Sequence, residues 1–283
     1  MLFAPANKPE LVAKLPRSGP DAVVLDLEDA VAAGAKVGAR RQARDGAAEL
    51  LALPDAGPDA APAVLVRVNS IRTEWFVGDI AEAVDPRVHA VVVPKIESLG
   101  DIATVATALR EAGCGGVGIV AGIETVRGVA DARELLGAEQ LVACYFGAED
   151  FTADLGGQRT DTNLEVVYAR SHVAIAARLA GVAALDMVVT DFHDADRYTR
   201  EASEARALGY AGKLCIHPSQ VPLANAAFSP TAADVERARR LLDAFDQASA
   251  QGSAVIVFEG QMIDEPLAAR ARAVLEAHER GSS

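Results

Sequence analysis

Residues 140–157, "QLVACYFGAEDFTADLGG", begin as an apolar run and pass directly into two adjacent acids, Glu149 and Asp150. A short apolar run without polar alternation is typical of a strand that is covered on both faces, as strands in parallel sheets are. The run therefore predicts a buried strand, and the two acids lie where that strand ends.

The same pattern recurs along the chain. Short runs rich in Val, Ile and Leu are separated by segments of helical spacing, which indicates parallel strands joined by crossover helices. The seven further runs span residues 2–4, 22–27, 63–68, 90–95, 116–123, 184–189 and 213–217. Eight such units within residues 1–220 predict an α/β fold, a TIM (β/α)8 barrel.

The segments between the predicted strands have the character of outer helices, because their apolar residues recur at helical spacing and four of the five segments end at or beside Gly. They are residues 34–53, 97–113, 125–137, 162–181 and 194–210. Residues 52–62 are rich in Pro, Gly and Asp and predict a loop.

After Pro218 the pattern changes to a long helical stretch at about 231–250, an apolar run at 254–258 and a last helix. This tail lies outside the eight units. Residues 221–283 are therefore predicted to form a C-terminal helical extension that completes the barrel or swaps onto a neighbouring one.

Composition excludes several classes of partner. The formal net charge of -13 repels phosphate backbones and anionic membranes, so neither nucleic acid nor membrane is expected as a partner. No apolar run reaches the ~18 residues of a membrane span. Cys114, Cys144 and Cys215 lie in apolar runs without metal-ligand spacing, which indicates reduced core thiols. These features predict a cytoplasmic protein.

Charged and polar residues follow most of the predicted strands, and in a barrel the carboxyl ends of the strands share one mouth. These residues are Asp26, Glu28, Asp29, Arg67, Asn69, Lys95, Glu124, Glu149, Asp150, Asp191 and His217. Each has a structural alternative. An acid after a strand could cap the next helix, Arg67 or Lys95 could form a structural ion pair with an acid, and His217 could be a hydrogen-bonded structural residue. Converging acids nevertheless repel one another unless a cation lies among them.

A hard divalent cation suits this mouth, since Mg²⁺ is usually bound by one or two carboxylates, waters and substrate oxygens. Glu124 and Asp150, after adjacent strands, are the predicted ligands. With Arg67 beside them, the site would bind an α-keto carboxylate. Backbone N–H groups at Gly147 and Ala148 are expected to hold the same carboxylate. Glu149 is expected to add its backbone N–H and nearby charge.

Eight ordered motifs give the chain a family resemblance. They are "LFAPANKPE" (2–10), "VVLDLEDAV" (23–31), "VLVRVNS" (64–70), "VVVPKIES" (91–98), "GIET" (122–125), "FGAEDFTADLGG" (146–157), "CIHPSQ" (215–220) and "FEGQMID" (258–264). The chain resembles the HpcH/HpaI aldolase/citrate lyase family, in the citrate lyase beta subunit-like branch that includes malyl-CoA and citramalyl-CoA lyases.

The resemblance implies a TIM barrel that uses Mg²⁺ to cleave or form a carbon–carbon bond between a keto acid and an acyl thioester. It makes Glu124 and Asp150 the metal ligands and Arg67 a substrate-binding and catalytic arginine. It also implies that Asp264 is catalytic and enters the active site of an adjacent subunit, which requires a trimer or a multiple such as a hexamer.

The leading hypothesis is thus a Mg²⁺-dependent lyase of a β-hydroxyacyl thioester such as citryl-, malyl- or citramalyl-CoA, with oxaloacetate among the candidate keto acids. The thioester could belong to CoA or to an acyl-carrier protein. Alternatives are a metal-dependent aldolase of a free hydroxy-keto acid, an aldolase in which Lys95 forms a Schiff base, and a non-catalytic subunit.

Overall fold

The computed structural model describes residues 1–53 and 61–280. The chain divides into two compact units, Met1–Ala224 and Asn225–Ser283. Most of the predicted loop at 52–62, residues 54–60, lies outside the described residues.

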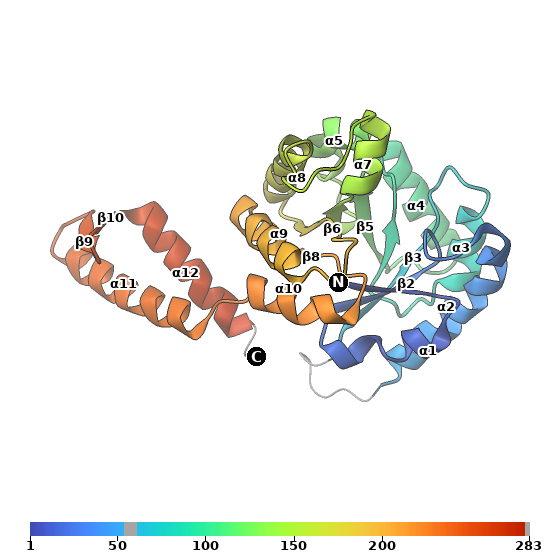
Figure 1. Cartoon of the computed structure of the whole chain (residues 1–283), viewed down its shortest axis with the longest axis horizontal. Coiled ribbons are helices and arrows are strands. Elements are labelled where there is room, and N and C mark those ends of the chain that lie inside the picture. The colour runs from blue at the N-terminus through green and yellow to red at the C-terminus, as the bar shows by residue number, and fades with distance from the viewer. Residues whose placement is uncertain (54–60, 281–283) are drawn as a thin grey trace. The chain divides into compact units, whose positions relative to one another are not determined.

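Eight parallel strands form the sheet of the first unit, in the order β1-β2-β3-β4-β5-β6-β7-β8 (Figure 1). A parallel bridge between Leu2 and Cys215 links the first strand to the segment after the last, so the sheet curls into a barrel. The strands are β1 (Leu2–Pro5), β2 (Ala22–Asp26), β3 (Ala63–Arg67), β4 (Ala90–Val93), β5 (Gly118–Ile123), β6 (Leu141–Phe146), β7 (Ala183–Asp186) and β8 (Gly212–Lys213). The predicted α/β barrel is confirmed.

The last two strands are shorter than the apolar runs at 184–189 and 213–217 predict. Beyond them, one side chain takes over the hydrogen bonds that a longer ladder would make. Gln220 Nε2 donates to the carbonyl of Val189, and Gln220 Oε1 accepts from the N–H of Ile216, both at 2.8 Å. These two segments are therefore hydrogen-bonded at the barrel mouth without being paired strands.

Helices cover the outside of the strands (Figure 1). Ser98 caps α4 through a capping box with Asp101, and Gly181 and Gly209 end α8 and α9 in the left-handed conformation. The helices of the first unit are α1 (Pro9–Val12), α2 (Lys36–Leu51), α3 (Phe76–Ala83), α4 (Leu99–Glu111), α5 (Val126–Ala130), α6 (Ala132–Leu135), α7 (Ala148–Leu155), α8 (Val167–Ala180), α9 (Ala195–Leu208) and α10 (Val221–Phe228), the last of which crosses the unit boundary, with 3-10 turns at η1 (Leu15–Ser18), η2 (Ala33–Ala35) and η3 (Pro218–Gln220).

The single helix predicted at 125–137 is wrong in one respect, because the chain leaves helical geometry at Asp131 (φ −97°, ψ 8°) and forms two short helices. The helix α3 was not predicted. It is only two turns long, and the Arg40 guanidinium lies so close to its Gly78 that a Cβ atom there would be 2.3 Å from Nη1. A side chain at position 78 would have to displace the Arg40 guanidinium from its ion pair with Asp79.

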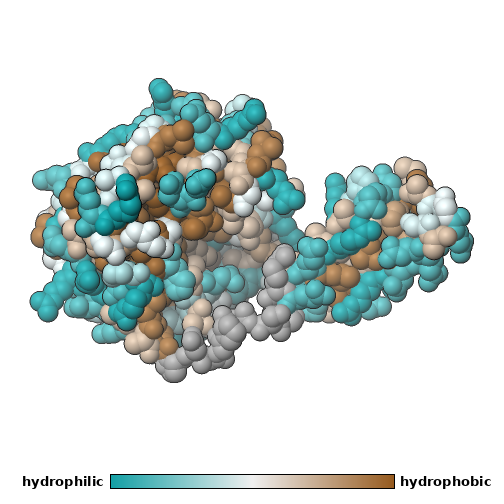
Figure 2. Space-filling view, turned by 180° about the vertical axis from the view of Figure 1, so that it is seen from behind, coloured by the Kyte–Doolittle hydropathy of each residue, from teal (hydrophilic) through white to brown (hydrophobic). Residues whose placement is uncertain are grey.

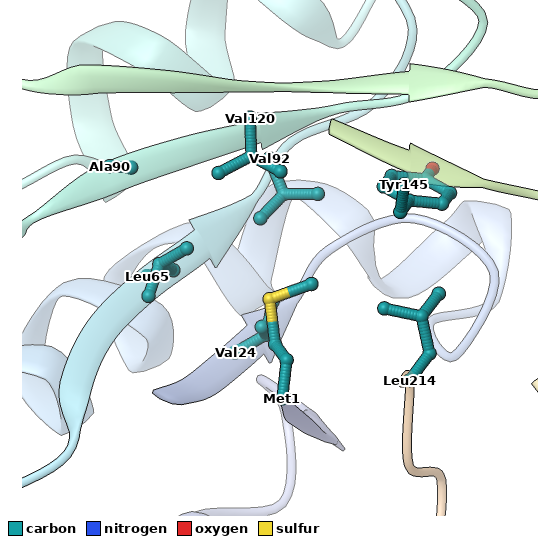
Figure 3. Close-up of a cluster of buried hydrophobic side chains, with 8 residues drawn as sticks. All are labelled: Met1, Val24, Leu65, Ala90, Val92, Val120, Tyr145 and Leu214. Carbon is teal, nitrogen blue, oxygen red and sulfur yellow. The ribbon is translucent and has the colours of Figure 1, made fainter. Parts of the chain in front are cut away.

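Small and aliphatic side chains fill the barrel interior, as the scarcity of aromatic residues predicts. Figure 3 shows eight buried side chains between the strands, of which only Tyr145 is aromatic: Met1, Val24, Leu65, Ala90, Val92, Val120, Tyr145 and Leu214. All three cysteines are buried and free, which agrees with the predicted core thiols.

A buried ion network joins β7 and β8 to α8 and α9. Asp186 accepts two hydrogen bonds from Arg170 (2.8 and 3.0 Å) and one from Lys213 (2.6 Å), and all three side chains are at most 2 % exposed. Lys213 Nζ also lies 3.7 Å from Glu201 Oε2. Because these charges are out of water, each depends on its partners.

We expect Asp186→Ala to lower the free energy of unfolding by about 3 kcal/mol, because it leaves the two buried cations without their shared carboxylate. Urea denaturation of the purified protein measures this. The matched control is Asp45→Ala, whose carboxylate lies 3.6 Å from Arg41 on an exposed helix face. That substitution should change stability by less than about 0.5 kcal/mol. Equal effects from the two substitutions would contradict the prediction.

The second unit is a helical hairpin with a small β-hairpin at its tip, made of α11 (Ala232–Ala250), β9 (Ile256–Phe258), β10 (Gln261–Ile263) and α12 (Glu265–Arg280). The antiparallel strands are joined by Glu259 and Gly260, both with positive φ (49° and 78°), as in a tight two-residue hairpin turn. The strand β10 was not predicted from the sequence. A core of its own, which includes Leu241, Phe245 and Ile263, holds this unit together.

The surface of both units is largely polar in the view of Figure 2, where teal residues predominate and brown residues form separate patches. This agrees with the strongly acidic composition. Within the residues that the structure describes, no helix combines the length and the apolar character needed to cross a membrane.

Candidate active site

A cavity of about 470 Å³ opens at the carboxyl ends of the barrel strands. Phe3, Tyr145 and Leu214 give it an apolar wall. Its charged lining consists of Asp26, Asp29, Arg67, Glu124, Glu149 and Asp150, and Gly147 and Ala148 also line it. The structure thus brings to one cavity all six barrel residues that were predicted to bind the metal or the substrate, whereas Asp264 belongs to the second unit.

Glu124 directly follows β5 and is 3 % exposed. Its Oε1 accepts a hydrogen bond from the backbone N–H of Lys95 (3.0 Å). Burial, followed by the negative charges of Glu28 and Asp150, raises the pKa of Glu124 to about 8. A carboxylate in these surroundings is ionised at neutral pH only when positive charge lies beside it.

The backbone at Gly147 passes directly over the Glu124 carboxylate. A Cβ atom at this position would lie 2.4 Å from Glu124 Oε2, so the approach requires glycine. The N–H of Gly147 donates to the carbonyl of Ile123 (3.2 Å) and continues the pairing of β6 with β5. The prediction that this N–H is available to a substrate is therefore wrong, because the sheet uses it.

The two acids that follow lie in the first turn of α7 and have different surroundings. Asp150 Oδ2 lies 3.0 Å from Lys95 Nζ, and its side chain is 41 % exposed at the cavity. Glu149 instead accepts a hydrogen bond from Arg159 Nε (2.9 Å). The N–H groups of Ala148, Glu149 and Asp150 belong to the helix N-terminus and have no partner within the helix, which suits them to bind an anion.

Arg67 ends β3 and makes two hydrogen bonds to Asp26, from Nε to Oδ1 (2.7 Å) and from Nη2 to Oδ2 (2.6 Å). Its Nη1 lies 2.9 Å from Glu28 Oε2, and its guanidinium carbon lies 5.1 Å from the centre of the Phe3 ring. Although burial lowers the pKa of Arg67, the charge and hydrogen bonds of Asp26 outweigh it and raise that pKa. The structural ion pair considered above is thus present, and it fixes a permanent cation in the cavity wall.

Lys95 has a positive φ of 56°, which is uncommon for a residue other than Gly and is found at functional sites. Its Nζ lies 3.2 Å from Glu28 Oε1 and 3.0 Å from Asp150 Oδ2. Burial lowers the pKa of Lys95, but the charges of Glu28, Glu124 and Asp150 outweigh burial and raise it. An ammonium held in this way is a poor nucleophile, because a Schiff-base lysine must lose its proton first.

Five residues that the sequence placed at the mouth do not line the cavity formed by the described residues. Glu28 and Lys95 contact its lining through ion pairs to Arg67 and Asp150, and the other three have different partners. Asn69 is buried in hydrogen bonds to Lys36 (2.6 Å) and Asp79 (2.6 Å). His217 caps η3 through Nδ1 and stacks on Phe192, at 4.6 Å between ring centres. Asp191 accepts from the N–H of His193 (3.0 Å) in a turn. Asn69, His217 and Asp191 therefore have structural contacts and are not part of the cavity lining.

The acids of the cavity suit a hard cation with oxygen ligands. Among the described residues, no group of three or more His, Cys, Asp and Glu side chains could hold a metal ion by itself. A site for Mg²⁺ does not need one, since one or two carboxylates with waters and substrate oxygens complete its octahedron. The raised pKa of Glu124 and the ion pairs of Lys95 with Glu28 and Asp150 both indicate that a positive charge would stabilise the ionised acids of this site.

Sequence reasoning missed Tyr145 as a cavity residue, because the tyrosine lies within an apolar strand run. It occupies the second-last position of β6, and its side chain lies among the buried core residues between the strands (Figure 3). The sequence did contain a signal, because Tyr145 lies only a few residues before the acids. A side chain that faces inward near the end of a barrel strand reaches the mouth.

Comparisons with known proteins agree with this geometry. The family described as HpcH/HpaI aldolase/citrate lyase matches residues 1–218. A citrate lyase subunit beta-like protein from Deinococcus radiodurans is 52% identical over 99% of this chain and 96% of its own.

Two solved structures from Mycobacterium tuberculosis are also similar. The protein CitE in complex with magnesium, acetoacetate and coenzyme A has a TM-score of 0.80, with 33% identity over 98% of this chain and 97% of that one. The citrate lyase beta subunit complexed with oxaloacetate and magnesium has a TM-score of 0.69, with 34% identity over 81% of this chain and 96% of that one.

Proposed function

Because the chain belongs to the HpcH/HpaI aldolase/citrate lyase family, we propose that it is a Mg²⁺-dependent carbon–carbon lyase acting on a β-hydroxyacyl thioester. The products of cleavage are a keto acid and an acyl thioester. The magnesium, oxaloacetate, acetoacetate and coenzyme A bound by the similar Mycobacterium tuberculosis structures support this class of ligands. The citryl, malyl and citramalyl thioesters are the candidate substrates, carried by CoA or by an acyl-carrier protein.

The observation that carries the proposal is the environment of Glu124. Its carboxylate is buried, faces like charges from Glu28 and Asp150, and has a pKa raised to about 8. We assign Glu124 and Asp150 as the residues that hold Mg²⁺, which would relieve this repulsion. When bound, the metal supplies Lewis acidity at the oxygens of the substrate.

Arg67 and backbone N–H groups of the cavity would stabilise the enolate and bind the keto acid. During cleavage the hydroxyl of the substrate releases its proton and becomes the keto group of the keto acid. The electron pair of the broken carbon–carbon bond stays on the acyl thioester as an enolate, and Arg67 is a fixed cation that would stabilise this charge. Asp26 holds the guanidinium through two hydrogen bonds, so the cation needs no reorganisation during the reaction. The N–H groups of Ala148 and Glu149 would hold the carboxylate of the keto acid.

The enolate needs a proton, and we assign its delivery to Asp264 of an adjacent subunit. Asp264 directly follows β10 and precedes α12, in the second unit. A site shared between subunits requires a closed ring, and a trimer or hexamer is the assembly that we propose. In the synthetic direction the same carboxylate would remove the proton from the acyl carbon.

A substrate panel tests the proposed function. We expect acetyl-CoA with glyoxylate, pyruvate or oxaloacetate, or the corresponding hydroxyacyl-CoA in the cleavage direction, to turn over only when Mg²⁺ is present. Coupled assays of the keto acid and of the free thiol separate lyase from thioesterase activity. Turnover of a free aldol without any thioester would instead support the aldolase alternative. Activity that persists in EDTA, or no activity with any substrate, would contradict the proposal.

A further inference from the structure

Tyr145 differs from the other buried tyrosines of the barrel. It is 2 % exposed and its ring packs among Val120, Leu214 and their neighbours (Figure 3). Within the described residues its hydroxyl makes no hydrogen bond of good geometry, although it lies near the Glu124 carboxylate. The hydroxyls of Tyr198 and Tyr210, in contrast, reach Cys215 Sγ (3.0 Å) and the carbonyl of Arg170 (2.8 Å).

Buried hydroxyls are nearly always hydrogen-bonded, and one that is not calls for a functional or ligand-based explanation. Desolvating the group without a partner destabilises the fold, so a simple core position favours phenylalanine. The same hydroxyl belongs to a residue that lines the cavity with Glu124 and Arg67.

The neighbouring strand makes room for this hydroxyl. Gly122 on β5 is the register partner of Tyr145 on β6, and a Cβ atom on Gly122 would lie 2.4 Å from the tyrosine oxygen. Gly147 makes the same kind of room for the Glu124 carboxylate. Two glycines therefore allow an uncharged donor and a buried acid to occupy the same end of the cavity.

We propose that Tyr145 is a substrate-binding residue whose hydroxyl donates a hydrogen bond to a carboxylate or keto oxygen of the bound keto acid. This inference rests on the proposed function. It assigns the hydroxyl a role in selectivity, since a ligand that offers no oxygen to it would leave a buried donor unpaired and would bind less tightly.

The test is Tyr145→Phe, which removes one oxygen and keeps the ring. Thermal melting without ligands should show a melting temperature equal to or above that of the wild type, because no hydrogen bond of good geometry is lost. Isothermal titration with oxaloacetate in MgCl2 should show a Kd weakened by about tenfold or more, the scale of one hydrogen bond to a charged group. Tyr210→Phe is the matched control, because its hydroxyl is bonded to Arg170 and is not part of the cavity lining. It should melt at a lower temperature and bind oxaloacetate as the wild type does.

Each other outcome overturns the inference in a recognisable way. If Tyr145→Phe binds oxaloacetate as tightly as the wild type, the hydroxyl contacts water only. If its melting temperature falls as far as that of Tyr210→Phe, the hydroxyl has a structural partner. If the wild type itself binds no keto acid in the presence of Mg²⁺, the proposed function fails first, and the inference fails with it.

Discussion

Replacing Glu124 by Gln should lower kcat by about 10³-fold or more while leaving the protein folded. The substitution keeps the shape of the side chain and removes the charge that is assigned to hold Mg²⁺, so the several kcal/mol that a catalytic metal supplies would be lost. Activity titrations against MgCl2 should show no saturation for the variant within the range that saturates the wild type. Loss of activity together with unchanged metal affinity would contradict the assignment.

The raised pKa of Glu124 separates a lost ligand from a damaged fold. Its pKa is about 8 in the folded protein against 4.5 as the ordinary value, so the folded state holds an extra proton between these values. Metal-free protein therefore loses stability as pH rises from about 4.5 to about 8, and Glu124→Gln should remove this loss. Binding of Mg²⁺ must release that proton, so the affinity of the wild type should rise with pH and level off above about 8.

The barrel could be predicted from the sequence because its signal is repeated. Parallel strands are buried on both faces, so each is a plain apolar run, and the runs at 22–27 and 63–68 coincide with β2 and β3 to within one residue. The prediction of strand length failed where a segment is buried but does not pair as a strand. Val189 and Cys215 are buried like strand residues, yet the strands end before them.

The charged residues of the candidate site could be predicted from the sequence, but the contacts between them could not. Glu124, Asp150 and Arg67 lie in one cavity because each is at or near the carboxyl end of a strand, and in a barrel these ends share one mouth. Which side chain pairs with which depends on distances that the sequence does not contain. The pairing of Arg67 with Asp26, the two ion pairs of Lys95 and the buried hydroxyl of Tyr145 all depend on such distances.

Asp264→Asn should lower kcat by about 10²–10⁴-fold, the range that a general acid or base contributes. Asparagine is chosen because Asp264 Oδ1 accepts from the N–H of Leu267 (3.4 Å) in the first turn of α12, and Asn also serves as a helix cap. Glu265→Gln is the matched control. Its carboxylate lies next in sequence and pairs with Arg272 (2.5 Å), so its loss should leave turnover near the wild-type value.

Mixing the two inactive variants decides whether Asp264 acts across a subunit boundary. When Glu124→Gln and Asp264→Asn chains are unfolded together and refolded at equal amounts, a site is intact if its barrel carries Glu124 and its neighbour carries Asp264. Random assembly into a closed ring gives about one quarter of such sites, so activity should return to about a quarter of the wild-type value. If both residues served the same site from one chain, every mixed site would lack one of them and mixing would restore nothing. Activity that tracks the trimer or hexamer fraction in size-exclusion chromatography would complete the case for a shared site.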